Sequence, residues 1–250
     1  MNRHIRNGFL ALTMLLLSSC AVTTPDSRLG TYIGSAASPP AGSPEACVPR
    51  EVGLLVVHDM NAKAAVPPLS PEALQHLTER IKIRMEESLP LKIVKVASPR
   101  SVTGDQGDFS WKRAAQEQGV DGLLLAVVSL VEATSRDRLP LDGSQEGGGA
   151  MGMLPGSTTS DYALVEFGLL DAKSDRMLAR VEGRGVATLE RLDSGLTSNA
   201  YPVVRQPGKA QRYFPPKDDK EAQGMVTYVA VDDALEQALY RWRACLKQSS

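Results

Sequence analysis

Aromatic residues and net charge are both scarce in this sequence. Phe, Trp and Tyr make up 5% of the 250 residues, too few for the aromatic platforms that stack bases or sugars. The 28 Lys and Arg nearly balance the 29 Asp and Glu, which leaves a net charge of -1. A nucleic-acid-binding protein needs a basic face, so we expect no nucleic-acid partner. Beyond the N-terminal segment, no apolar run reaches the roughly 18 residues that span a bilayer.

Motifs for metals, cofactors and nucleophilic catalysis are also missing. The chain has 3 His and 3 Cys, and it contains no CxxC, no HExxH and no clustered pair of these residues. A zinc site therefore has no support, and we expect no metal and no cofactor. The glycine-rich residues 147–152 lack the Lys-Ser/Thr and the helix that complete a phosphate-binding loop. Ser194 and Ser198 lack the Gly-x-Ser-x-Gly context of a catalytic serine.

The N-terminal segment carries the most specific pattern that is present. Arg3 and Arg6 precede an apolar run over residues 9–17, which is typical of a secretory signal peptide. The run ends in Leu17-Ser18-Ser19-Cys20, which resembles the lipobox of bacterial lipoproteins. The resemblance implies a signal peptide over residues 1–19, cleavage before Cys20, and attachment of acyl chains such as palmitate to Cys20.

A lipidated cysteine determines where the protein is expected. Several acyl chains hold a protein on a membrane essentially permanently. The residue after Cys20 is Ala21, not the Asp that resembles an inner-membrane retention signal. The resemblance therefore implies lipid anchoring in the outer membrane, with the domain facing the periplasm.

Cysteine usage is compatible with that compartment. If Cys20 is lipidated, Cys47 and Cys245 remain, and the periplasm oxidises thiols. We predict a Cys47–Cys245 disulfide that ties the start of the domain to its last helix. The alternative is two free, partly buried thiols.

Composition divides the mature chain into a tether and a domain. Residues 20–50 are rich in Ala, Ser, Thr, Pro and Gly, which is typical of a flexible tether. Within them, the apolar side chains of residues 28–33 give a short piece that could dock on the domain. Residues 51–248 are expected to form a single α/β domain.

Predicted strands and helices alternate along the domain. Apolar runs indicate buried strands, with Val56 and Leu125 at their centres, and serine caps indicate helix starts. The predicted elements are strand 52–57, helix 71–88, strand 91–96, helix 111–118, strand 123–131, a hairpin of strands 162–171 and 177–189, and helix 218–247. A flexible loop at 135–160 and an irregular excursion at 193–216 separate some of them. This β-α-β-α-β-β-β-α order predicts an α/β fold, a mixed β-sheet with helices packed against it.

The same elements carry a family resemblance. Strand 52–57, the Gly119-Val120-Asp121 entry to the next apolar strand and the Asp171-Ala172-Lys173-Ser174 turn resemble those of a group of periplasmic lipoprotein domains. The group includes the curli-secretion channel, the penicillin-binding-protein activator lipoprotein and the N-terminal domain of the Tol translocation protein. A nearer resemblance is to rhombotarget lipoproteins, which share the Gly-Val-Asp entry, the turn and a Pro-Gly, here Pro155-Gly156. It implies an envelope lipoprotein and assigns no catalytic residue.

Few polar residues are candidates for a site. Asp121 and Asp171 flank apolar strands, where an Asp turns the chain and, at Asp171, starts the hairpin turn through an Asx-type bond. His58-Asp59 follows the first apolar strand, at the carboxyl end where α/β sheets often place sites. An acid beside a histidine could tune a general base, but neighbouring residues on an extended segment point to opposite sides. A surface turn is the plainer interpretation.

Two functions therefore remain open. The first is a non-catalytic, membrane-anchored periplasmic lipoprotein that acts through protein–protein interaction, with an envelope protein as partner or as a homo-oligomer. The alternative is a periplasmic hydrolase that uses His58 with a carboxylate. The chain offers no catalytic set, so we favour the first.

Overall fold

The computed structural model describes residues 24–34, 50–60, 68–102, 109–140, 152–193, 195–196, 198–215 and 218–248. Its helices are α2 (Leu29–Ile33), α3 (Pro71–Ser88), α4 (Trp111–Gln118) and α5 (Asp219–Gln248). Its strands are β1 (Arg50–Asp59), β2 (Leu91–Val96), β3 (Arg100–Val102), β4 (Gly122–Pro140), β5 (Met153–Asp171), β6 (Arg176–Leu192), β7 (Val203–Arg205) and β8 (Arg212–Tyr213). The predicted order of elements is confirmed, with α2, β3, β7 and β8 added to it.

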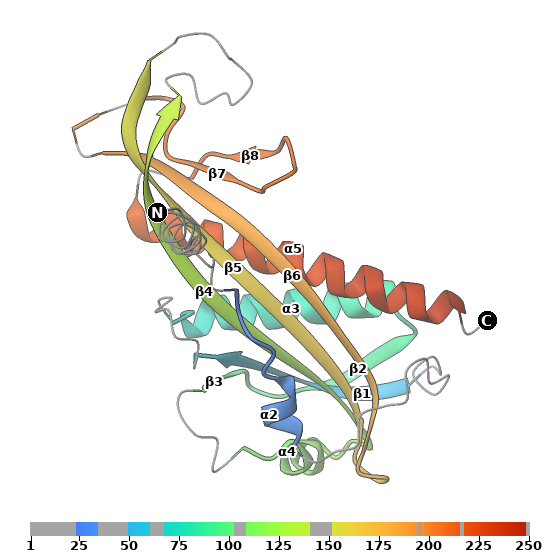
Figure 1. Cartoon of the computed structure of the whole chain (residues 1–250). Coiled ribbons are helices and arrows are strands. Elements are labelled where there is room, and N and C mark those ends of the chain that lie inside the picture. The colour runs from blue at the N-terminus through green and yellow to red at the C-terminus, as the bar shows by residue number, and fades with distance from the viewer. Residues whose placement is uncertain are drawn as a thin grey trace, which may run out of the picture.

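The strands form one mixed sheet with helices on both faces. The strand order is β2-β1-β4-β5-β6-β7-β8, and β3 pairs with β1 beyond the end of β2. β1 pairs in parallel with β2, β3 and β4, whereas the pairs from β4 to β8 are antiparallel. Figure 1 shows α3 and α5 over one face and α2 and α4 over the other. The predicted α/β class with a mixed sheet is confirmed.

Burial on both faces explains the unbroken apolar runs of β1 and β4. Val56 and Leu125 are both 0% exposed, as predicted from runs without polar alternates. In β1, Leu54 and Val56 belong to the cluster under α3 and α5, and Leu55 and Val57 to the cluster under α2 and α4. A central strand covered on both sides needs apolar residues at every position.

The predicted helix ends also match the structure. Ser70 and Ser110 accept hydrogen bonds from the N–H groups of Ala73 (3.1 Å) and Arg113 (3.3 Å). Gly119 ends α4 in the left-handed conformation at φ 64, which an L side chain adopts only with strain. These signals are local, so they can be interpreted without knowledge of the rest of the chain.

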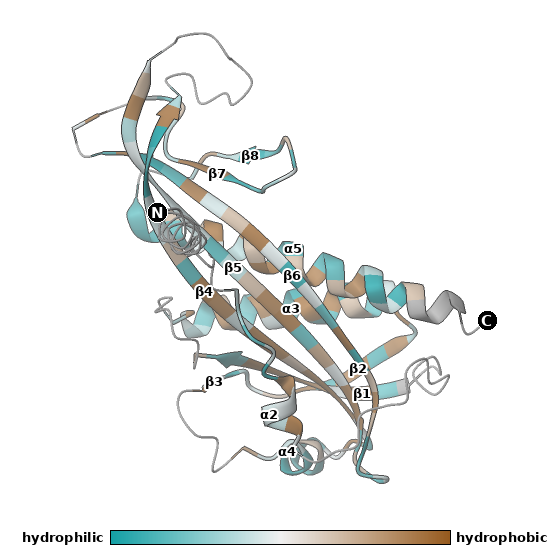
Figure 2. Ribbon diagram, viewed as in Figure 1, coloured by the Kyte–Doolittle hydropathy of each residue, from teal (hydrophilic) through white to brown (hydrophobic). Residues whose placement is uncertain are grey.

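The predicted flexible loop at 135–160 is wrong at both ends. β4 continues to Pro140 and β5 begins at Met153, in an unbroken antiparallel register. The apolar signal stops near Val131 because the following residues of β4 are largely exposed, and Figure 2 shows hydrophilic positions on this upper part of the hairpin. Backbone hydrogen bonds and cross-strand pairs such as Thr134–Thr159 (3.2 Å between hydroxyl oxygens) hold these strands instead. Residues 141–151 lie outside the described part.

The predicted irregular excursion at 193–216 contains short paired segments. β7 pairs with the end of β6, and β8 pairs with β7. Two or three residues are too few for an alternating pattern to stand out in a sequence. Tyr201 donates its hydroxyl hydrogen to the Pro140 carbonyl (2.9 Å), so this segment also contacts the end of β4.

Candidate functional site

The anchor and disulfide predictions depend on three cysteines, which are largely outside the described part of the chain. Cys20 and Cys47 fall outside the described residues. Cys245 belongs to the helical backbone of α5, and its side chain is outside the described part. Lipidation of Cys20 and the Cys47–Cys245 bridge therefore stay predictions.

His58 and Asp59 do not form the surface turn expected for them. Both are the last residues of β1, and each is only 2% exposed. They pack on opposite faces of the sheet, because successive strand residues alternate. Asp59 accepts a hydrogen bond from Arg28 Nε (2.8 Å), not from His58. Burial lowers the pKa of His58, which favours the neutral imidazole.

The Asx turn predicted at Asp171 is confirmed, whereas the Asp121 side chain pairs with a lysine of that turn. The Asp171 Oδ1 accepts hydrogen bonds from the N–H groups of Lys173 (2.9 Å) and Ser174 (3.2 Å), which is an Asx turn. The Asp121 carbonyl accepts from the Ala172 N–H (2.8 Å), and its exposed carboxylate pairs with Lys173 Nζ (2.6 Å). The hairpin turn and the entry to β4 are thereby fastened to each other.

The most highly connected carboxylate in the described part is Glu166, which the sequence analysis missed. Its side chain is fully buried on β5. The N–H groups of Arg28 (2.6 Å) and Leu29 (2.9 Å) donate to its Oε2. The Ser27 hydroxyl (2.7 Å) and Arg180 Nη2 (3.0 Å) donate to its Oε1. One buried carboxylate therefore satisfies the first amides of α2 and holds the segment in front of it.

Apolar contacts complete the docking of this segment. Leu29, Tyr32 and Ile33 are buried against the sheet, in the cluster that includes the α4 side. Gly168 on β5 leaves room for α2, since a Cβ there would lie 3.1 Å from the Ile33 Cδ1. The predicted flexible tether over 20–50 is therefore wrong for its described residues 24–34. The docking predicted for residues 28–33 is confirmed.

A second buried carboxylate, Asp161, faces the opposite side of β5. It accepts hydrogen bonds from the Thr227 hydroxyl (2.5 Å) and from Gln223 Nε2 (3.5 Å), both on α5. Gln223 Nε2 also donates to Glu132 Oε2 (2.6 Å). Burial raises the pKa of Asp161 to about 6, the Thr227 bond opposes this rise, and the charge of Glu132 adds to it.

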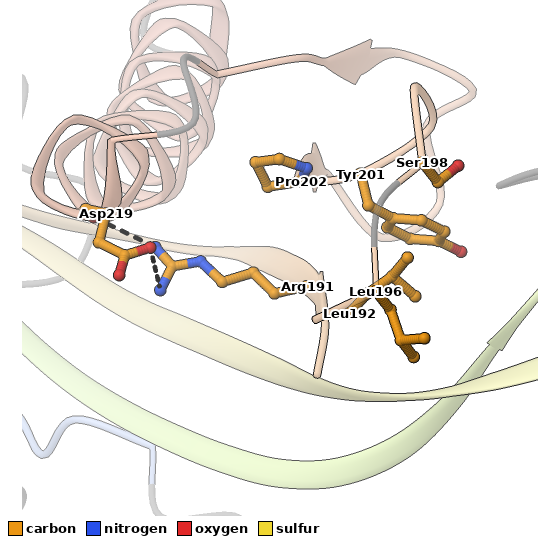
Figure 3. A pocket seen from close by; sticks show the side chains of 7 residues that line it. All are labelled: Arg191, Leu192, Leu196, Ser198, Tyr201, Pro202 and Asp219. Carbon is orange, nitrogen blue, oxygen red and sulfur yellow. Dashed lines mark hydrogen bonds and ion pairs between the residues drawn. The ribbon is translucent and has the colours of Figure 1, made fainter. Parts of the chain in front are cut away.

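A small pocket opens between the end of β6, the chain before β7 and the start of α5 (Figure 3). Its volume is about 170 Å³, below the roughly 300 Å³ of the smaller ligand sites in proteins. Two of its polar side chains have partners, since Arg191 Nη1 pairs with Asp219 (3.2 Å) and Ser198 Oγ accepts from the Ala200 N–H (3.1 Å). Among the described residues, the buried Arg191 Nε has no hydrogen-bond partner. Neither His58 nor His76, the two histidines in the described ranges, is among its lining residues.

No helix in the described part of the chain is long and apolar enough to cross a membrane. No group of three or more His, Cys, Asp and Glu side chains in the described ranges could hold a metal ion.

No family model matches the chain, and no curated protein matches its sequence. Solved structures give loose likenesses. A neuraminyllactose-binding hemagglutinin homologue from Helicobacter pylori has 10% identity and a TM-score of 0.31, over 79% of this chain and 94% of that chain. A lipoprotein from Neisseria meningitidis has 14% identity and a TM-score of 0.27, over 59% and 88%. The rare lipoprotein B from Shewanella oneidensis has 13% identity and a TM-score of 0.23, over 78% and 92%. Likenesses this loose assign neither a family nor a function.

Proposed function

We propose that this protein is a membrane-anchored periplasmic lipoprotein that is not an enzyme and acts through protein–protein interaction in envelope assembly or secretion. The observation that carries the proposal is Leu17-Ser18-Ser19-Cys20 at the end of an apolar signal-peptide run. A thiol at this place can take a thioether-linked diacylglycerol, and acyl chains stabilise membrane attachment by about 0.8 kcal/mol per buried CH₂. With Ala21 next in the chain, we propose the outer membrane as the destination.

The described side chains support a binding role over a catalytic one. The His58 imidazole is buried and apart from the Asp59 carboxylate, which pairs with Arg28. The helices α3 and α5 expose the apolar side chains of Ile83, Tyr228 and Tyr240, and Tyr240 is 74% exposed. Aromatic side chains are frequent in protein interfaces, so these positions suit contact with an envelope protein.

Replacement of Cys20 by Ser tests the anchor. The variant should incorporate no labelled palmitate, because the hydroxyl cannot form the thioether, whereas Cys245→Ser should be labelled as strongly as the natural chain. A second chain, in which residues 1–20 are exchanged for a signal peptide with an Ala-x-Ala cleavage site, should be released into the periplasmic fraction. Palmitate labelling and membrane fractionation measure both effects. Labelling of Cys20→Ser, or membrane retention of the second chain after a high-salt wash, would contradict the anchor.

A further inference from the structure

We infer that the docked residues 24–33 hold the domain directly against the bilayer, with the α2 and α4 face of the sheet toward the lipid and the α3 and α5 face away from it. The inference deepens the proposed function and rests on lipidation of Cys20. The connection between the anchor and the domain is then short and fixed, and not a long flexible tether. The helices α3 and α5 form the surface that a periplasmic partner contacts.

Only a short stretch of chain separates Cys20 from the docked residues. Thr24, the first described residue, follows Cys20 by four positions. A fully extended chain spans at most about 3.6 Å per residue, so the lipidated residue lies within roughly 14 Å of Thr24. Had residues 20–50 formed a flexible tether, the domain could have stood several times farther from the membrane.

Contacts with the sheet begin one residue after Thr24. Arg184 Nη1 donates to the carbonyl of Pro25 (3.3 Å), and Pro25 is buried. The Ser27 hydroxyl and the Arg28 N–H then donate to Glu166. Residues 25–28, which directly precede α2, are therefore held by β5 and β6, and the place where the chain leaves the domain is fixed.

Charge pairing makes this connection costly to open. Glu166 is fully buried, and undocking would remove the hydroxyl and two amides that donate to it, which leaves Arg180 as its partner from the sheet. Undocking would also separate Arg28 from the buried Asp59. Undocking would replace these charge-assisted hydrogen bonds by bonds to water and would expose Leu29, Tyr32 and Ile33, so the docked state is favoured.

The docked segment and α5 lie on opposite faces of the sheet. Thr24 leads into α2, which packs on β5 on one face of the sheet, while α5 packs on β5 and β6 from the other (Figure 1). The sheet and a helix about 10–12 Å wide therefore separate the anchored side from the outer surface of α5. An anchor that reaches only about 14 Å from Thr24 brings the bilayer to the α2 side.

Spin labels on the two faces test the orientation. In a chain that carries Cys47→Ser and Cys245→Ser, a label at Thr31→Cys on the exposed side of α2 is compared with one at Tyr240→Cys on α5. The lipidated protein is reconstituted into vesicles of phosphatidylethanolamine and phosphatidylglycerol that contain a nickel-chelating lipid. We expect relaxation enhancement at residue 31 to exceed that at residue 240 several-fold, because the effect falls steeply with distance from the surface.

A matched control keeps the fold and changes only the connection. Twelve Gly and Ser residues inserted between Val22 and Thr23 leave Glu166 and its donors intact, and should reduce the difference between the two labels toward equality. Equal relaxation at the two positions without the insertion would overturn the orientation, and so would a difference that the insertion leaves unchanged. If the protein as purified from membranes carries no acyl chains and does not bind the vesicles, the proposed anchor is contradicted. The orientation would then be rejected with it.

Discussion

Glu166 and Asp161 lie on the same strand, and both carboxylates are fully buried, but their partners differ. Glu166 accepts from two backbone N–H groups, a hydroxyl and an arginine, so its negative charge is well compensated. Asp161 faces neutral donors on α5, with the charge of Glu132 nearby. Burial without a cation raises the pKa of Asp161 to about 6.

Asp161→Asn should therefore stabilise the protein at neutral pH. Because the pKa is about 6 in the folded state and 3.8 is its ordinary value, the native state binds more protons between these values, and Asp161 lowers stability as the pH rises through that window. Above pH 6 the expected gain for Asn is up to roughly 3 kcal/mol, reduced by whatever the Thr227 bond loses. Urea unfolding at pH 4 and pH 7 measures it. Equal pH dependence in the two proteins would show that Asp161 does not titrate in this way.

Residues with local partners were predictable, and residues with distant partners were not. Ser70, Ser110 and Asp171 bond to amides two or three positions away, so their roles can be inferred from neighbouring letters. Glu166 bonds to Ser27, 139 positions away, and nothing near Glu166 in the chain indicates that contact. A lone acid inside the apolar run of β5 was the available signal, since a buried carboxylate needs donors from elsewhere.

At the scale of elements, the packing of α5 on β6 depends on two glycines of the strand. A Cβ at Gly183 would lie 1.9 Å from the Ala234 carbonyl oxygen, and one at Gly185 would lie 2.1 Å from that of Ala230. The helix backbone therefore rests directly on the strand. The sequence predicted the helix itself. The residues that face the sheet include the small Ala230 and Ala234, whereas Tyr228 is exposed.

Gly183→Ala and Gly224→Ala form a matched pair of variants. The first adds a methyl group against helix backbone that cannot yield, so we expect a loss of about 1–3 kcal/mol or more. The second adds the same group to α5 where nothing lies within 4 Å, and helix propensity predicts a gain of about 1 kcal/mol. Denaturant unfolding of both proteins checks the signs. A Gly183→Ala protein as stable as the natural one would mean that α5 does not approach β6 this closely.

Across the whole molecule, the order of elements could be predicted and the lengths of some strands could not. Apolar periodicity reports burial, so it identified the central strands and ended at Val131, where the side chains of β4 become exposed. The last nine residues of β4, from Glu132 to Pro140, are held by backbone pairing with β5, which leaves no apolar pattern. Residues 24–34 resembled a tether for another reason, because they lie within a stretch rich in Ala, Ser, Thr, Pro and Gly. The apolar side chains of 28–33 indicated the docking, but nothing near them indicated the buried Glu166 that accepts from the Leu29 N–H.

The Cys47–Cys245 disulfide is a prediction about the whole molecule, because it would join its two ends. Arg50, three residues after Cys47, starts β1 beside Leu91 of β2. Arg243, two residues before Cys245, donates to the Ser88 hydroxyl at the end of α3, three positions before Leu91. The described residues Arg50 and Arg243, which are close to the two cysteines in the chain, therefore lie near the same end of the sheet. Three residues of extended chain span at most about 11 Å.

Such a bridge would close a loop of about 200 residues and restrict the unfolded chain, worth roughly 5 kcal/mol on the loop-entropy model before any strain is subtracted. Protein isolated from the outer-membrane fraction should therefore migrate faster on a non-reducing gel than after reduction, and mass spectrometry should find the two cysteine peptides joined. Cys47→Ser and Cys245→Ser should each abolish the mobility difference and lower the melting temperature by a similar amount, because each removes the same constraint. If both thiols are alkylated in the unreduced, unfolded protein, the predicted disulfide is absent.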